Sequence, residues 1–321
     1  MRSIQISFII PLLVISFFLA CKSDKKQSRS DGFKYEDAIN KDESENYIEV
    51  ITRSMEFQTV DTLKSGWNTF LYRNLSNETH FFLFEKLPDG IRMENYKTEL
   101  VPPFEKAFSN FLEGKIDAGM KELEQIPKWF YDVELYGGVG LVSPKSVGQS
   151  SIFLDPGYYA MECYIRMPNG KAHAFMGMLK EVLVLDKKSD ELEPKEDFTI
   201  SVSSTEGIIF SDSLISGNYV IKVDFKDQKQ YETLLGHDVN LVKLDNLNLV
   251  DSLNIWINAA DLNQFRTPAP KGIQFLGGVN DISNKKSGYF TVNLSPGIYA
   301  FVSEVPNAKS KGMLKTFTIT E

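Results

Sequence analysis

The amino-acid sequence predicts a mainly β protein with two tandem antiparallel β-sandwiches and a helical insertion in the first. Three observations lead to this prediction. Short segments of alternating apolar residues recur along the chain, with Ser-Gly, Pro-Asp-Gly or Pro-Gly turns beside them. A weak internal repeat relates the two halves. One stretch instead has apolar residues at helical spacing. The clearest strand segments are 81–84, 151–154, 159–165, 198–202, 219–225 and 289–292.

The start of the chain predicts a lipoprotein signal peptide at residues 1–20. Arg2 supplies a positive charge, residues 4–18 are mostly apolar, and a small residue precedes Cys21. The apolar run is short for a membrane span, and its end resembles the lipobox of bacterial lipoproteins, whose cysteine becomes the lipidated N-terminus. Plain secretion without lipidation is the alternative. Lys22 is similar to the residue found after the cysteine in lipoproteins sent to the outer membrane. The predicted location is therefore the bacterial cell envelope, with a lipid anchor in the outer membrane.

Residues 21–46 predict a flexible tether, because they are rich in Lys, Ser, Asp and Glu and poor in apolar residues. The whole chain carries a net charge of −8, and cleavage of the signal peptide would remove one more positive charge. This acidic balance disfavours nucleic acid and anionic lipid as general partners. The predicted partner is the membrane, reached through the lipid on Cys21. If Cys21 is lipidated, Cys163 is a lone thiol in an oxidising compartment, where we expect it to be buried or bound to a metal.

Five sequence matches in the same order relate the two halves. They pair 63–70 with 214–221, 80–87 with 237–244, 136–138 with 276–278, 154–160 with 294–300, and 177–180 with 312–315. A charged run with one proline, typical of a linker, lies between the halves. We therefore expect a first domain at 47–186, a linker at 187–196 and a second domain at 197–321. Each domain is long enough for its own core.

The stretch from Phe104 to about Ile126 has apolar residues near helical spacing. Pro103 lies just before it and Pro127 just after it, which is typical of helix boundaries. We expect one or two helices inserted between strands of the first domain. Their apolar stripe is expected to pack on the sandwich.

Side chains that bind soft metals gather between Cys163 and Met178, with His173 between them. Thiol, imidazole and thioether groups are the ligand types of a type 1 copper centre. The three histidines of the chain are dispersed and form no Ser-His-Asp or HExxH pattern, and no Gly-rich phosphate loop follows a strand. The protein is therefore not expected to be an enzyme.

The motifs around these residues resemble an uncharacterised group of cupredoxin-like domains in bacterial envelope proteins. The shared pattern comprises Ser65-Gly66-Trp67, the turn from Asn74 to His80, Gly137-Gly138, and the stretches 154–163 and 168–178. The resemblance implies Greek-key β-sandwiches of the cupredoxin type. By analogy it also implies a mononuclear copper site in the first domain, with His80, Cys163 and His173 in the plane and Met178 as a weak axial ligand.

The turn between Cys163 and His173 decides whether the two residues can share a metal. A two-residue turn at Asn169-Gly170 would pair Arg166 with His173 and put Cys163 on the opposite face. A three-residue loop at 168–170, with Gly170 in the left-handed conformation, would pair Ile165 with His173. Cys163 would then share a face with His173 and Phe175. Proline before Asn-Gly favours the three-residue loop, because proline pre-sets the first central residue of a type I turn.

The second half lacks part of the ligand set. Ser303 stands at the position of Cys163, and the segment that contains His173 has no counterpart. His237 and Met313 are nevertheless kept at the positions of His80 and Met178. Residues that persist where a site is absent are explained by packing, so structural roles for His80 and Met178 remain open.

Two functions therefore remain open. The first is an envelope lipoprotein whose first domain binds copper for electron transfer or copper handling, while the second domain is a structural or docking module. The second is a metal-free surface module that recognises a protein or glycan through its loops or helical insertion. The joint presence of Cys163 and His173 in one half alone favours the first function, and the retained His237 and Met313 favour the second.

Overall fold

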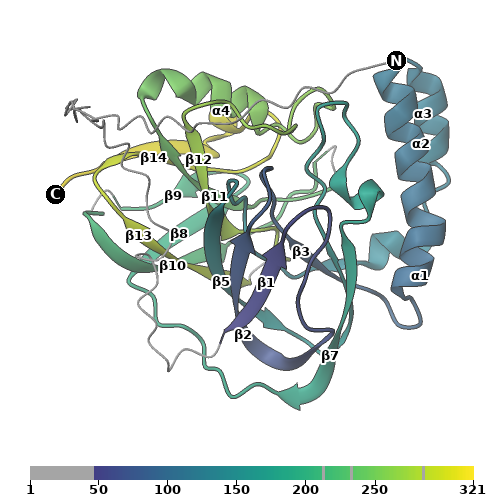
Figure 1. Ribbon diagram of the computed structural model, residues 1–321, viewed down its shortest axis with the longest axis horizontal. Helices are drawn as coiled ribbons and strands as arrows, with labels where there is room; N and C mark the ends of the chain where they lie inside the picture. Colours follow the sequence, from purple (N-terminus) through teal and green to yellow (C-terminus); the bar gives the residue numbers. More distant parts are fainter. Residues whose placement is uncertain (1–46, 212–213, 232–233, 284–285) are drawn as a thin grey trace, which may run out of the picture. The chain divides into compact units, whose positions relative to one another are not determined.

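Strands make up most of the regular structure, so the mainly β prediction is confirmed (Figure 1). The computed structural model describes residues 47–321 except 212–213, 232–233 and 284–285. The strands of the first half are β1 (Ile48–Thr52), β2 (Thr62–Asn74), β3 (Leu83–Lys86), β4 (Glu134–Leu135), β5 (Ser146–Leu154), β6 (Gly157–Glu162) and β7 (Leu179–Lys188). Those of the second half are β8 (Phe198–Ser203), β9 (Gly207–Ile209), β10 (Gly217–Phe225), β11 (Val239–Leu244), β12 (Ile273–Val279), β13 (Ser287–Leu294), β14 (Gly297–Val302) and β15 (Leu314–Ile319).

The helices of the described residues cover far less of the chain than the strands. The α-helices in the described residues are α1 (Met93–Asn95), α2 (Val101–Leu112), α3 (Ile116–Leu123) and α4 (Val250–Trp256). A π-helical turn covers Tyr96–Leu100, and 3-10 turns cover Lys128–Asp132, His173–Met176, Leu247–Leu249 and Ala308–Lys311. None of the helices in the described ranges has the length and apolar character for a membrane span. The predicted signal peptide, Cys21 and the tether all fall before residue 47, outside the described residues.

The strands form two sheets. One follows the order β4-β3-β6-β7-β2-β5-β13-β10-β8-β9, with β1 parallel to β2, and the other has the order β12-β11-β14-β15. Strands β5 and β13 pair antiparallel, with Tyr289 opposite Ser151, so the larger sheet contains strands from both halves. Nearly all described residues of the core also form one apolar cluster. The proposed boundaries at 186/187 and 196/197 stay a prediction.

Strand pairing is equivalent in the two halves at the positions that the repeat predicts. The equivalent pairs are Gly66–Leu154 and Gly217–Leu294, Leu83–Glu162 and Asn240–Val302, and Gly157–Val184 and Gly297–Ile319. Counting back from β3 and β11 along these registers places His80 and His237 at the same position. The sequence match between these histidines is therefore also a match of strand register.

The same steric constraint explains why both halves have a Gly-Gly pair at this point of the repeat. A Cβ atom on Gly138 would lie 1.9 Å from the carbonyl oxygen of Phe82, and one on Gly278 would lie 2.0 Å from the carbonyl oxygen of Val239. Phe82 and Val239 are equivalent in the strand register. In both halves the second glycine thus lies so close to the backbone of a neighbouring segment that no side chain fits.

The helical insertion is present as two helices, α2 and α3, which lie side by side (Figure 1). Part of its apolar stripe meets the rest of the protein: Phe108 of α2 makes an edge-on contact with Phe175 at 5.6 Å between ring centroids. The stripe does not pack on the sandwich along its whole length, however. Ile116 and Met120 of α3 are 57% and 53% exposed, and the aromatic residues of α2 line a cavity.

Candidate metal centre

The turn after Cys163 is the three-residue loop that proline favours. The Met167 N–H donates to the Lys171 carbonyl oxygen (2.8 Å), and Gly170 has φ +88°. Arg166 is bridged to Ala172, and the His173 N–H donates to the Ile165 carbonyl oxygen (2.9 Å). Ile165 therefore pairs with His173, and the parity that brings Cys163 and His173 to one face is confirmed.

The chain after His173 differs from the expected hairpin. Residues His173–Met176 form a 3-10 turn, so the strand does not continue and Phe175 does not join the face of Cys163. Phe175 points instead to Phe108 of α2. The strand pairing resumes at Met178, whose carbonyl oxygen accepts from the Cys163 N–H (3.4 Å). Between the pairing of Ile165 with His173 and that of Cys163 with Met178, one side of the hairpin therefore has three more residues than regular pairing allows. The 3-10 turn that begins at His173 accommodates them.

His80, Cys163 and His173 converge in the core. Cys163 Sγ lies 3.8 Å from Nδ1 of His80 and 3.8 Å from Nδ1 of His173, and the two Nδ1 atoms are 3.1 Å apart. All three side chains are 0% exposed. Among the described residues this is the one group of three or more His, Cys, Asp or Glu side chains whose ligand atoms lie close enough to hold a metal ion.

The spacing of the three atoms fits a single metal ion. Metal–nitrogen bonds of about 2.0 Å and metal–sulfur bonds of about 2.3 Å, the values of zinc sites, would put nitrogen and sulfur about 3.7 Å apart in a trigonal arrangement. The two nitrogens would be about 3.5 Å apart. The observed separations of 3.8, 3.8 and 3.1 Å differ from these values by a few tenths of an ångström. One thiolate and two imidazole nitrogens are also a donor set that suits copper.

Burial controls the charge of this cluster in the metal-free protein. It raises the pKa of the Cys163 thiol to about 12, although the backbone N–H groups of Phe81 and Ile165 favour the thiolate. It lowers the pKa of His173 to about 4, and burial together with the neighbouring His173 lowers the pKa of His80 to about 3. Both imidazoles are therefore neutral at pH 7, as metal ligation requires, and a cation would stabilise the thiolate that burial disfavours.

Met178 lies beside this cluster along the chain. Its N–H donates to the His173 carbonyl oxygen (3.1 Å), its carbonyl oxygen accepts from Cys163, and its side chain is fully buried. These backbone bonds fix the position of Met178 relative to both residues. These backbone bonds are compatible with a structural role of the Met178 side chain and equally with a role as a metal ligand.

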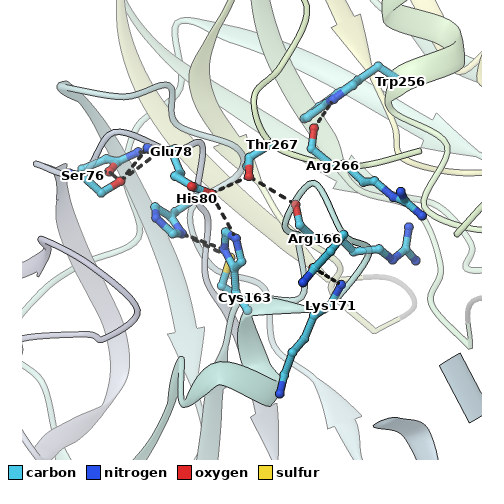
Figure 2. Close-up of polar contacts among 12 residues, drawn as sticks. Ser76, Glu78, His80, Cys163, Arg166, Lys171, Trp256, Arg266 and Thr267 are labelled. Carbon is cyan, nitrogen blue, oxygen red and sulfur yellow. Dashed lines mark hydrogen bonds and ion pairs between the residues drawn. The ribbon is translucent and has the colours of Figure 1, made fainter. Parts of the chain in front are cut away.

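A carboxylate that the sequence did not indicate lies next to His173. The Glu78 Oε2 atom is 3.4 Å from His173 Nε2, and Glu78 also accepts from the Thr267 hydroxyl (Figure 2). The Nε2 atoms of both His80 and His173 are buried without a hydrogen-bond partner. A metal on the Nδ1 atoms would leave the protons on Nε2, and Glu78 is placed to attract the proton of His173. Neither Glu78 nor Thr267 belongs to a recognisable ligand motif, so spacing alone could not identify them.

The equivalent place in the second half holds a hydrogen-bonded polar cluster. The Ser303 N–H donates to the Met313 carbonyl oxygen and the Met313 N–H to the Ala308 carbonyl oxygen, the same pattern as Cys163, Met178 and His173. Ala308 begins a 3-10 turn, as His173 does, and stands at its position. The prediction that the segment containing His173 has no counterpart in the second half is therefore wrong: the turn is kept and only its histidine is missing. The Ser303 hydroxyl donates to Asp238 (2.6 Å).

His237 is also engaged by other groups. Its Nε2 atom is 3.1 Å from the Tyr231 hydroxyl, and its Nδ1 atom is 3.4 Å from the Asp227 carbonyl oxygen. Both ring nitrogens thus have protein partners, in contrast to the Nε2 atom of His80.

Comparison with known proteins gives structural likenesses alone. No family model and no curated protein matches the chain. Auracyanin B matches with 23% identity over 41% of this chain and 96% of that chain, at a TM-score of 0.29. Auracyanin A of Chloroflexus aurantiacus, described as a blue copper protein, matches with 14% identity over 44% of this chain and 98% of that chain, at 0.26. A copper-containing nitrite reductase of Thermus scotoductus matches with 11% identity over 86% of this chain and 61% of that chain, at 0.22. At these TM-scores the functional argument rests on the geometry of the site.

Proposed function

We propose that the first half of the protein is a cupredoxin-like domain that binds one copper ion. His80, Cys163 and His173 would hold the ion, and Met178 would be a weaker fourth ligand. The convergence of Cys163 Sγ with the Nδ1 atoms of both histidines, at separations of 3.1 to 3.8 Å in a fully buried cluster, carries this proposal.

The chemistry of this donor set is one-electron transfer or copper handling. A thiolate with two imidazoles binds both Cu(I) and Cu(II), so a bound copper ion would exchange electrons without a change of ligands. The protein contributes rigidity, because the ligands come from a packed core in which side chains have little room to move. We propose no catalytic role. The second half, equivalent in strand register but without the thiol and the second imidazole, would be a structural or docking module.

Titration of the mature full-length protein with Cu(II) tests the metal site. We expect one equivalent to bind and to produce an intense visible thiolate-to-copper absorption band. Cys163→Ser should abolish the band, His173→Ala should abolish or shift it, and Met178→Leu should shift it. His237→Ala is the matched control and should leave the band unchanged. Absence of the band from the unmodified protein would favour the metal-free surface module instead.

We also propose that the protein is a lipoprotein of the bacterial envelope, anchored through Cys21 to the outer membrane. The lipobox-like end of the apolar segment and the following Lys22 support this proposal. Cys21→Ala should move the protein from the membrane fraction to the soluble fraction of cells. Unchanged membrane partition in this variant would contradict lipidation.

A further inference from the structure

The segment formed by β6 and the residues after it, which include Cys163, has different side chains on its two faces. Alternation along β6 and the residues after it turns Cys163 toward the core, and turns Glu162, Tyr164 and Arg166 toward a space between the helical insertion and loops of the second half. These three side chains line a cavity of about 580 Å³. A cavity of this volume is within the range of small-molecule sites.

The walls of the cavity are mainly aromatic and aliphatic. They come largely from the helical insertion and the 3-10 turn that follows it: Phe104, Phe108 and Phe111 lie in α2, and Phe130 lies in that turn. Ring contacts hold these walls together, since Phe104 packs edge-on against both Phe108 (6.1 Å) and Phe130 (5.6 Å). The walls therefore suit the apolar body of a ligand.

The strand residues that line the cavity form its floor, and one end of this floor contains two neighbouring carboxyl groups. Glu85 and Glu162 lie on adjacent strands and are 3% and 7% exposed. The Tyr96 hydroxyl donates to Glu162 Oε2 (2.9 Å), whereas the Glu85 Oε2 atom is buried with no hydrogen-bond partner. None of the ion pairs in the described residues involves either carboxyl group. Glu85 and Glu162 instead bond to each other and to Tyr96. Buried carboxylates are normally paired with a cation, and neither of these has one.

Burial raises the pKa of Glu85 well above its usual value, and the neighbouring Glu162 raises it further. Burial raises the pKa of Glu162 as well. A cationic ligand would reverse this effect, because a positive charge beside the two groups favours their ionised forms. The same groups would repel an anion.

Arg166 lies at the other end of the floor and does not supply the missing cation. It is four residues from Glu162 along an extended segment, a distance of about 13 Å. Its guanidinium donates to the carbonyl oxygens of Ala259, Asp261 and Gln264, which fixes it to the second half. The carboxyl end of the cavity is thus free of positive charge from Arg166.

We propose that this cavity binds an organic ammonium compound with an apolar, ring-bearing body. The ammonium group would donate to Glu85 and Glu162, and the ring would pack against the phenylalanines of the insertion. Aromatic rings also attract cations through their π faces. A metal ion fits less well, because two carboxyl groups among apolar walls offer too few oxygen ligands.

Calorimetric titration of the metal-free, full-length mature protein with three probes of one ring size tests this inference. The probes are 2-phenylethylammonium, 2-phenylethanol and 3-phenylpropionate. We expect the ammonium to bind at least tenfold more tightly than the alcohol, and the carboxylate to bind more weakly than the alcohol. Because no metal is present, the result is independent of the copper proposal.

Two isosteric variants locate the binding group. Glu85→Gln and Glu162→Gln should each weaken ammonium binding at least tenfold and change alcohol binding less than twofold. Glu94→Gln, which removes an exposed carboxylate of α1, is the control for net charge and should bind like the unmodified protein. Equal affinity for the ammonium and the alcohol, no ammonium binding at millimolar concentration, or ammonium binding unchanged in both variants would each overturn the proposal. If neither variant folds, the ranking of the three probes on the unmodified protein decides.

Discussion

The first and second halves of this protein share a backbone arrangement and differ in the side chains placed on it. His80 and His237 have the same strand register, and Met178 and Met313 make the same backbone hydrogen bonds. At the two remaining positions the first half has Cys163 and His173, whereas the second half has serine and alanine. The backbone therefore does not determine whether three metal-binding atoms meet. Two side chains do.

The second half shows how the same position is stabilised without a thiol. Ser303 and Asn240 both donate to the buried Asp238. The register places Asp238 at the position of Phe81 in the first half. A polar network in the second half thus corresponds to an aromatic contact and a thiol in the first. The polar groups of the second half are hydrogen-bonded to one another, so they can be buried without an aromatic neighbour. Four predictions test this comparison, from the largest expected effect to the smallest.

The shared backbone should be equally intolerant of a side chain at the second glycine of each Gly-Gly pair. Gly138→Ala and Gly278→Ala should each lower the free energy of unfolding by more than about 3 kcal/mol, because the new methyl group would overlap a carbonyl oxygen. Gly90→Ala is the control: it has a positive φ but nothing within 4 Å of the new atom, so it should cost about 1 kcal/mol. Urea denaturation measures all three. A large effect in one half alone would break the comparison.

Only the second half should depend on a carboxyl group at this position. Burial raises the pKa of Asp238 to about 6, from 3.8. The unfolded state is then the more ionised between these values, so stability falls as pH rises from about 4 to about 6, by up to about 3 kcal/mol. Asp281 and Glu304 add to the slope with the same sign, because burial raises their pKa values too.

Asp238→Asn should reduce this slope, measured as the free energy of unfolding at a series of pH values. Phe81→Leu, at the equivalent position, should lower stability by a similar amount at every pH. Glu85 and Glu162 of the first half add to the slope as well, because burial raises their pKa values. If Asp238→Asn left the slope unchanged, these other buried carboxyl groups would produce the whole effect.

The missing ligands can be added to the second half. Ser303→Cys combined with Ala308→His should allow a second equivalent of Cu(II) to bind, if the copper proposal for the first half holds. The new site should be weaker by about 2 kcal/mol, or about 30-fold, because His237 must give up two hydrogen bonds. Each single variant should bind one equivalent, like the unmodified protein. A double variant that still binds one equivalent would show that the backbones differ more than their registers indicate.

The sequence predicted the features that depend on local chemistry. Proline before Asn169-Gly170 correctly indicated the three-residue loop, and with it the common face of Cys163 and His173. The repeat correctly matched His80 with His237, because both lie a fixed number of residues before an equivalent strand. Helical spacing correctly indicated the insertion.

Other features depend on contacts between distant segments, which spacing does not encode. The 3-10 turn at His173–Met176 interrupts a segment that alternates like a strand, so it could not be recognised locally. The cavity arises because the helices of the insertion meet each other and the loops of the second half over a polar strand face. The pairing of β5 with β13 has the same origin, because each strand taken alone is an ordinary alternating segment.

The smallest effect concerns Glu78, which has no carboxylate counterpart in the second half. The strand register places Leu235 at its position. If Glu78 orients His173 through Nε2, Glu78→Leu should weaken copper binding about tenfold, or about 1.4 kcal/mol, without loss of the second imidazole. Glu78→Gln keeps an oxygen that can accept from His173 and from Thr267, so it should recover most of the affinity. Competition with a chromophoric chelator measures the three affinities. Equal loss in both variants would assign the effect to the charge of Glu78, and no loss in either would leave His173 positioned by its 3-10 turn alone.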